Sequence, residues 1–154
     1  MKVLSFLFLI LSFNIFAADY EFENIKVIDE FSIDEEIYRA DKDVMLIFNN
    51  GTCFNSTNRC YPYERKVNYL APQINARGVE IMNMDVSFNR YHQRYNIKKL
   101  PAVIFFAKGS YITMLEPNTC SYYERNHDCR MRNLTWVNYL LQETLDTLNQ
   151  VYHF

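Results

Sequence analysis

The chain has little of the residues that interrupt regular structure, with three Gly and four Pro in 154 residues. These counts exclude collagen-like and low-complexity chains. Neither sign of charge dominates, since 16 basic residues face 18 acidic ones, and no basic run is interleaved with aromatics, so we expect no nucleic-acid partner. Apolar residues, in contrast, make up 49% of the chain, with 12 Tyr and 12 Phe. That content excludes disorder and predicts one folded domain.

Long apolar runs are absent except near the start. Lys2 is followed by an apolar stretch that ends in Ala17 and Ala18. This pattern predicts a secretory signal peptide over residues 1–17 and one domain over residues 18–154. A membrane anchor is the alternative, but the run is short of the roughly 20 residues of a span, and Asn14 interrupts it. We expect no membrane contact after cleavage and a location in the secretory pathway, as an endoplasmic-reticulum lumenal or secreted protein. The bacterial periplasm is the alternative location.

Four cysteines in a secreted chain favour disulfides over metal ligation. Three connectivities are open, and we favour the local pairs Cys53–Cys60 and Cys120–Cys129. Each pair closes a short loop, worth about 2–3 kcal/mol. A zinc site that includes His127 is the alternative, but the spacings lack the CxxC pairs of such sites. We therefore expect no metal and no other cofactor.

Apolar patterns predict strands at residues 25–28, 44–48, 79–86, 102–106 and 111–115. Helices are predicted over residues 33–39 behind a Ser32 cap, from Pro62 up to a kink or end at Pro72, briefly after Ser87, and from Asn133 onward. Strands separated by helices imply parallel pairing, and the late hairpin adds an antiparallel edge. The fold class is therefore α/β, with a central mixed sheet flanked by helices.

Two stretches resemble the thioredoxin fold. Residues 95–106, Tyr-Asn-Ile-Lys-Lys-Leu-Pro-Ala-Val-Ile-Phe-Phe, resemble the segment in which a cis-proline precedes a central strand, and Pro101 is the matching proline. The strand at 44–48, the pair Cys53 and Cys60, and the following helix resemble the region of the family's redox cysteines. The resemblance covers residues 20–150. It implies a thioredoxin-like fold in which Pro101 lies beside the cysteines and exposes backbone to an extended peptide.

The redox motif departs from the family pattern. The family has CxxC, whereas six residues separate Cys53 from Cys60. Thr52 stands where the family has Trp, Ile47 where it has a buried acid, and Leu100 where it has a β-branched residue. We therefore favour a structural disulfide. The alternative is a thiol–disulfide oxidoreductase in which Cys53 attacks and Cys60 resolves.

A narrower resemblance concerns two short segments. Residues 28–33 resemble the opening of domains related to protein disulfide isomerase, and residues 61–66 resemble a Tyr-Pro-Tyr-x-x-Lys stretch in endoplasmic-reticulum secretion factors of the Windbeutel type. Those factors bind client proteins through an aromatic-rich surface and have no redox activity. The resemblance implies client polypeptides as partners, held by Tyr61, Tyr63, Leu100 and Pro101. A structural extracellular domain with two disulfides is the third alternative.

Three sequons predict glycosylation at Asn50, Asn55 and Asn133. One or two such triplets would arise by chance in this composition. A glycan on Asn55 would obstruct redox chemistry between Cys53 and Cys60, which again favours a structural role for that pair.

Overall fold

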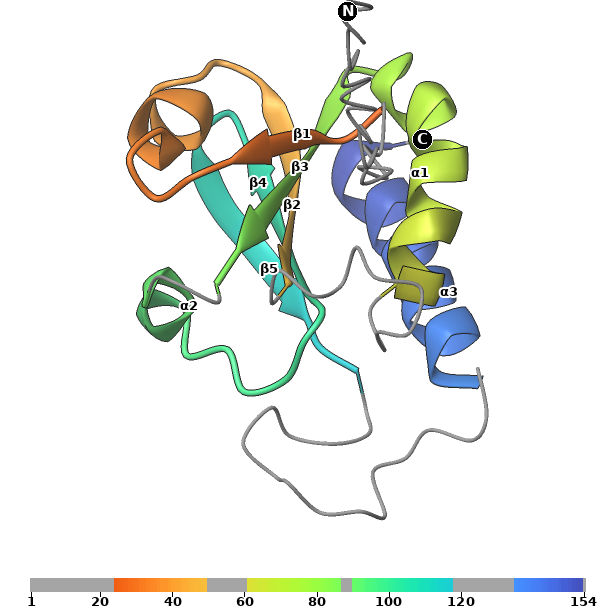
Figure 1. Ribbon diagram of the computed structural model, residues 1–154. Coiled ribbons are helices and arrows are strands. Elements are labelled where there is room, and N and C mark those ends of the chain that lie inside the picture. Colours follow the sequence, from red (N-terminus) through yellow and green to blue (C-terminus); the bar gives the residue numbers. More distant parts are fainter. Residues whose placement is uncertain (1–23, 50–60, 87–89, 118–134, 154) are drawn as a thin grey trace, which may run out of the picture.

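The computed structural model describes residues 24–49, 61–86, 90–117 and 135–153. The elements, in chain order, are β1 (Lys26–Ile28), η1 (Asp34–Tyr38), β2 (Asp43–Asn49), α1 (Tyr61–Asn75), β3 (Val79–Asp85), α2 (Tyr91–Arg94), β4 (Ala102–Ala107), β5 (Ser110–Leu115) and α3 (Thr135–Tyr152) (Figure 1). The order matches the sequence prediction element by element. The α/β class and the mixed, helix-flanked sheet are confirmed.

The five strands form one sheet in the order β1-β3-β2-β4-β5. β3 pairs in parallel with β1 and β2, whereas β4 pairs antiparallel with β2 and β5. Residues 44–49 of β2 are all buried, as its continuous apolar run predicts for a strand covered on both faces. β1 and β5 are the two edges of the sheet.

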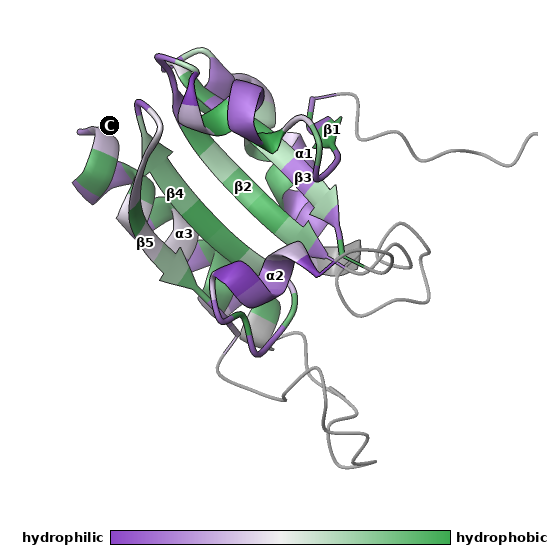
Figure 2. Ribbon diagram, turned by 90° about the vertical axis from the view of Figure 1, so that its left-hand side faces the viewer, coloured by the Kyte–Doolittle hydropathy of each residue, from purple (hydrophilic) through white to green (hydrophobic). Residues whose placement is uncertain are grey.

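The two faces of the sheet carry different helices. α1 and α3 lie together on one side, and η1 and α2 lie on the other (Figure 1). Side chains alternate along β2, so that Met45 and Ile47 pack on the α1/α3 face while Leu46 and Phe48 pack on the η1/α2 face. Figure 2 shows the apolar strands β2 and β4 from the η1/α2 side.

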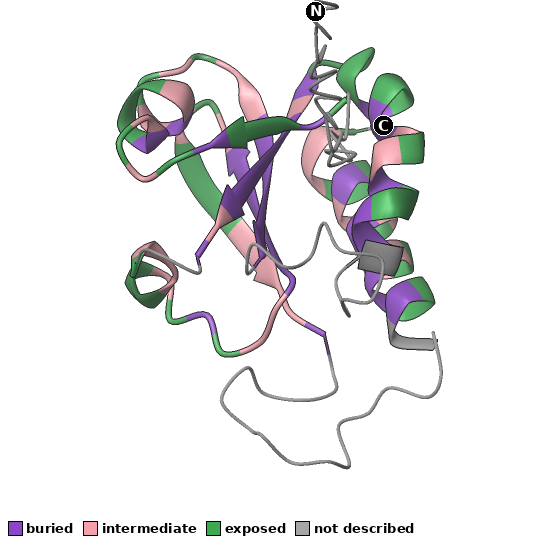
Figure 3. Cartoon of the chain, viewed as in Figure 1, coloured by how far each residue is buried: buried purple, intermediate pink, exposed green. Residues whose placement is uncertain are grey.

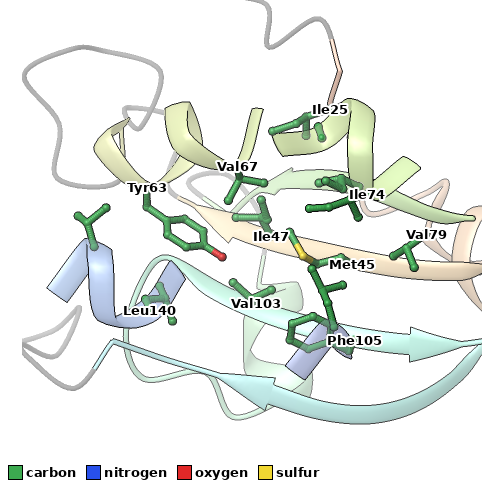
Figure 4. Packing of buried hydrophobic residues seen from close by; sticks show 14 residues of the cluster. Ile25, Met45, Ile47, Tyr63, Val67, Ile74, Val79, Val103, Phe105 and Leu140 are labelled. Atoms are coloured by element: carbon green, nitrogen blue, oxygen red, sulfur yellow. The ribbon is translucent and has the colours of Figure 1, made fainter. Parts of the chain in front are cut away.

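The α1/α3 face is the more continuous core. Tyr63, Val67 and Ile74 of α1 lie against Met45 and Ile47 of the sheet (Figure 4). The spacing of these α1 residues places them on one side of a helix, which explains why this side is buried and the opposite side is exposed (Figure 3). From α3, Val137, Leu140 and Leu148 complete the cluster.

Two local predictions need correction. Pro72 was predicted to kink or end its helix, and an end at this residue is wrong, because α1 continues to Asn75. The helical hydrogen bonding passes the proline, since the Ala76 N–H donates to the Pro72 carbonyl at 3.0 Å. The Ser32 hydroxyl does not cap the next helix, because its backbone N–H and its hydroxyl both bond Asp29. The helix that follows is a five-residue π-helix.

The β4–β5 hairpin turns through Lys108 and Gly109, with φ of 48° and 79°. Positive φ at both central residues is the type I′ arrangement, which favours glycine. A Cβ on Gly109 would lie 2.5 Å from the Tyr38 carbonyl oxygen, so the glycine also permits η1 to pack here. Further back along the chain, the Leu100–Pro101 peptide bond is cis. Among the described helices, none combines the length and the apolar character needed to cross a membrane.

Candidate functional sites

Three polar side chains are buried together where β2 and β3 end beside the first turn of α1. They are Asn49 of β2, Asn83 of β3 and Glu64 of α1, which we call the polar cluster. Asn49 follows Met45 and Ile47 in the strand alternation, and Asn83 follows Val79 and Ile81, so both amides belong to the α1/α3 face. Each of the three residues is at most 1% exposed.

The hydrogen bonds of the polar cluster are incomplete. The Asn49 amide Nδ2 donates to Glu64 Oε1 at 2.8 Å and also to Asn83 Oδ1. Within the described residues, Asn49 Oδ1, Glu64 Oε2 and Asn83 Nδ2 have no hydrogen-bond partner. A buried polar group left without a partner costs about 1–3 kcal/mol. Such an arrangement persists against that cost, which marks the polar cluster as a candidate functional site.

Burial raises the pKa of Glu64 to about 7. The Asn49 amide acts in the opposite direction, because its hydrogen bond to Glu64 stabilises the carboxylate, and the negative charge of Asp85 raises the pKa further. The side chain therefore changes its charge near neutral pH, as a proton acceptor or donor must. In contrast, hydrogen bonds lower the pKa of Asp29 and of Glu36, two carboxyl groups at the surface.

The sequence carried a signal for the polar cluster that we did not use. Asn49 and Asn83 fall at strand positions where the alternation requires apolar residues, and Glu64 lies three residues before Val67 on the buried side of α1. A polar residue at an apolar position of a periodic pattern is more informative than an exposed one. Ile47 occupies the strand position where the sequence comparison noted the absence of a buried acid, whereas the buried acid of this chain, Glu64, lies on α1.

A second cluster lies on the η1/α2 face. It consists of four tyrosines that contact one another in sequence around Tyr95, together with Arg94, and we call these five residues the tyrosine cluster: Tyr38 of η1, Tyr91 and Arg94 of α2, Tyr95, and Tyr111 of β5. Tyr95 stacks on Tyr111 with ring centroids 6.3 Å apart and contacts Tyr91 at 6.0 Å. Beneath them Tyr95 packs on the buried rings of Phe48 and Phe106, at 5.7 and 6.2 Å.

Arg94 joins the polar ends of the tyrosine cluster. Its guanidinium lies 5.0 Å from the Tyr38 ring centroid and 5.5 Å from that of Tyr91, and its Nη1 donates to the Tyr91 hydroxyl at 2.7 Å. The Tyr38 and Tyr95 hydroxyls bond each other. Burial, with Tyr38 close by, raises the pKa of Tyr91 to about 12. The cluster is thus a hydrogen-bonded aromatic surface that carries one positive charge, that of Arg94.

Among the predicted client-binding residues whose side chains are described, Tyr63 and Leu100 pack on opposite faces of the sheet and do not form one patch. Tyr63 is fully buried on the α1/α3 face, and its hydroxyl meets Thr144 Oγ1 at 2.8 Å, so its predicted surface role is wrong. Leu100 is half-buried and packs against the core of the η1/α2 face, and Pro101 is buried. Tyr61 begins α1, but its side chain lies outside the described residues.

Several predicted positions also lie outside the described residues, namely the cysteines Cys53, Cys60, Cys120 and Cys129 and the sequon residues Asn50, Asn55 and Asn133. In the part of the chain that is described, no group of three or more His, Cys, Asp or Glu side chains could hold a metal ion.

A groove of about 300 Å³ runs between α1 and α3 on the outside of the α1/α3 face. Leu70, Ile74 and Leu145 form its apolar floor, and Arg77 and Asp146 line it with charge of both signs. No residue of the polar cluster or the tyrosine cluster lines it. The groove is therefore separate from both candidate sites.

Of the comparisons with known proteins, only the one with solved structures finds a match, and it shows the fold alone. No protein-family model matches the chain, and no curated protein matches it. Among solved structures it is similar to a thioredoxin of Malassezia sympodialis, Mala s 13, a member of a pan-allergen family. The two share 18% identity and a TM-score of 0.50 over 60% of this chain and 77% of that one. The chain therefore has a thioredoxin-like fold.

Proposed function

We propose that this protein binds client polypeptides in the secretory pathway and assists their folding or secretion, with weak or no redox activity. The signal-peptide pattern of residues 1–17 supports the location, and the sequence resemblance to Windbeutel-type factors supports the class of partner. The observation that carries the proposal is the tyrosine cluster. Tyrosine and arginine are enriched in protein interfaces and among the residues that contribute most to binding.

The tyrosine cluster suits unfolded clients of varied sequence. Tyr111 is 51% exposed, and the other rings beside it are partly exposed. Their flat faces accept apolar client side chains, while the hydroxyls and Arg94 accept or donate hydrogen bonds at the rim. Leu100 and Pro101 lie in the segment that leads from α2 to β4, and Tyr95 begins that segment. Binding of a client segment to this surface requires no cofactor.

The test is the binding of a fluorescent, reduced and carboxymethylated lactalbumin, which stays unfolded, measured by anisotropy. We expect Tyr111→Ser and Arg94→Gln each to weaken binding about fivefold or more, as for central interface residues. Tyr69→Ser is the matched control, because Tyr69 is 79% exposed on α1 and far from the cluster in the fold. Failure of the unsubstituted protein to bind, or equal loss in the control, would contradict the proposal.

The polar cluster favours a second candidate, a thiol–disulfide oxidoreductase. Cys60 directly precedes α1 in the sequence, and Glu64 is the fourth residue of that helix. In such a reaction the Cys53 thiolate attacks a client disulfide and releases one client thiolate. The Cys60 thiol then gives its proton to Glu64, and its sulfur attacks Cys53 to form the Cys53–Cys60 disulfide while the second client thiolate leaves. The proton passes from Glu64 to solvent or to the leaving thiolate.

Turnover of insulin disulfides separates the two candidates. Robust activity that Cys53→Ser abolishes would make the oxidoreductase the correct function. In that case Glu64→Gln should slow turnover and remove a step near pH 7 from its pH profile, since the buried carboxyl would no longer titrate. Absence of turnover together with lactalbumin binding favours the binding protein.

A further inference from the structure

The two edges of the sheet differ in how well they are protected against pairing. β1 has only three residues and begins at Lys26, whose ammonium pairs with Glu36 at 2.6 Å. A short strand and a lysine are two of the devices that keep an edge from accepting another strand. β5, at the other edge, has six residues, Ser-Tyr-Ile-Thr-Met-Leu. It is twice as long as β1 and contains neither a charged residue nor a proline, so a bulge is the one device of this kind that its edge carries.

Within the described residues, the backbone of β5 is paired on one side only. β4 pairs with it, and no other described strand lies beyond it. In an antiparallel edge strand, every second residue turns its N–H and C=O away from the sheet. These groups match the backbone of an extended polypeptide, and a helix or a folded surface cannot satisfy them in the same way.

The register of β5 defines where a strand could add. Tyr111 pairs with Phe106 and Thr113 with Phe105, so Ile112 is an extra residue at a bulge. A bulge adds twist and interrupts pairing, which leaves Thr113, Met114 and Leu115 as the regular part of the edge. Ile112 is 43% exposed beside it, next to Tyr111 of the tyrosine cluster.

We propose that β5 accepts an extended, uncharged segment of a client polypeptide as an added strand, with its side chains resting on Tyr111 and Ile112. The inference rests on the proposed client-binding function and assigns its mode. Backbone pairing explains how one surface can hold clients of different sequence. The short regular edge implies weak and reversible binding.

A second copy of the chain is a less suitable occupant. A strand of six residues is about 20 Å long. Pairing two such edges buries less than the roughly 1,200 Å² at which stable protein interfaces begin. A client segment needs no such area, because it can be released and bound again.

The test uses the octapeptide Gly-Thr-Val-Thr-Val-Thr-Val-Gly labelled with fluorescein, and the same peptide N-methylated at its four central amides. The two peptides share side chains, but the second has lost the backbone donors that strand addition needs. We expect methylation to weaken binding about tenfold or more, because several hydrogen bonds are lost together. Ile112→Lys should weaken binding of the parent peptide similarly. Tyr139→Lys on α3, at a residue 47% exposed, should leave it unchanged.

Hydrogen exchange of the free protein completes the test. We expect about half of the β5 amides to exchange rapidly and to become protected when the peptide is added. Protection already present in the free protein would mean that the chain's own residues or a second copy cover the edge, and light scattering would tell these apart. Either finding overturns the inference, as does equal binding of the two peptides.

Failure of the inference differs from failure of the proposed function. If lactalbumin binds and depends on Tyr111 and Arg94 while the octapeptide does not bind, strand addition is wrong and client binding stands. If neither probe binds, both proposals are wrong.

Discussion

The two faces of the sheet are covered in different ways, although the central strands are buried on both. On the α1/α3 face, helices of 15 and 18 residues close a core that contains the polar cluster. On the η1/α2 face, η1 and α2 have only five and four residues, and half-exposed tyrosines cover part of the sheet. Long helices can hide a titrating carboxyl from water, whereas short ones leave aromatic rings at the surface. The two faces thus carry different candidate sites, the buried polar cluster on one and the half-exposed tyrosine cluster on the other.

The largest expected effect on stability concerns Tyr63, whose side chain joins α1 to α3. The Tyr63 hydroxyl donates to Thr144, because the Thr144 hydroxyl proton is used on the Leu140 carbonyl at 2.7 Å. Tyr63→Ala should lower the free energy of unfolding by about 3–5 kcal/mol, since it leaves a large cavity. Urea denaturation measures this, with the exposed Tyr69→Ala as control. Equal losses in the two variants would erase the distinction between buried and surface tyrosines.

The next largest effect is a pH dependence of the free energy of unfolding, which arises from Glu64 on the same α1/α3 face. The folded-state pKa of Glu64, about 7, lies above its ordinary value of 4.5, so the folded protein holds this proton more tightly than the unfolded chain. Stability from this group is complete below pH 4.5 and falls as the pH rises to about 7, by roughly 3 kcal/mol. Glu64→Gln should remove the decrease and stabilise the protein at pH 8. Unchanged pH dependence in that variant would show that Glu64 is not buried as a carboxylic acid.

A smaller effect on stability distinguishes two glycines, of which Gly109 lies against η1 and Gly78 lies in open space. Gly109 and Gly78 both have positive φ, but only at Gly109 does a Cβ meet neighbouring atoms, those of Tyr38 and Ile37. Gly78→Ala should cost about 1 kcal/mol from backbone strain alone. Gly109→Ala should cost about 1–2 kcal/mol more, because η1 must shift. Thermal unfolding of the pair measures the difference, and equal melting temperatures would mean that η1 does not pack closely on the hairpin.

The smallest effect compares hydroxyl groups on the two faces. Tyr38→Phe removes the hydroxyl that bonds Tyr95, and Tyr63→Phe removes the one that bonds Thr144. The buried Tyr63 hydroxyl should contribute about 1–1.5 kcal/mol, and the half-exposed one at Tyr38 less than about 0.5 kcal/mol, because water replaces it there. Chemical denaturation of the two variants tests the order. The reverse order would indicate that the tyrosine cluster is as closed as the opposite core.

Most of the fold could be predicted from the sequence because its signals are local. Continuous apolar runs predicted β2 and β4, and the stripe of Val67, Leu70 and Ile74 predicted α1. The same stripe also contained the information that Tyr63 is buried, since it lies four residues before Val67 on the same side of the helix. Its position near the helix start led us to expect a surface residue instead.

Neither candidate site could be predicted as a whole, because each is assembled from distant parts of the chain. The tyrosine cluster draws residues 38, 95 and 111 together from η1, the end of α2 and β5. Each tyrosine has an ordinary sequence context. For the polar cluster the strand alternation marks Asn49 and Asn83 as unusual, but only the packing of α1 on the sheet shows that Glu64 meets them.

Mapping a bound client by hydrogen exchange with mass spectrometry tests the difference between the faces most directly. With saturating carboxymethylated lactalbumin, we predict slower exchange in segments 33–39, 90–96 and 110–115, which hold η1, α2 and β5. Exchange in α1 and α3 should stay unchanged. Protection confined to α1 and α3, on the groove between them, would contradict the assignment of client binding to the η1/α2 face.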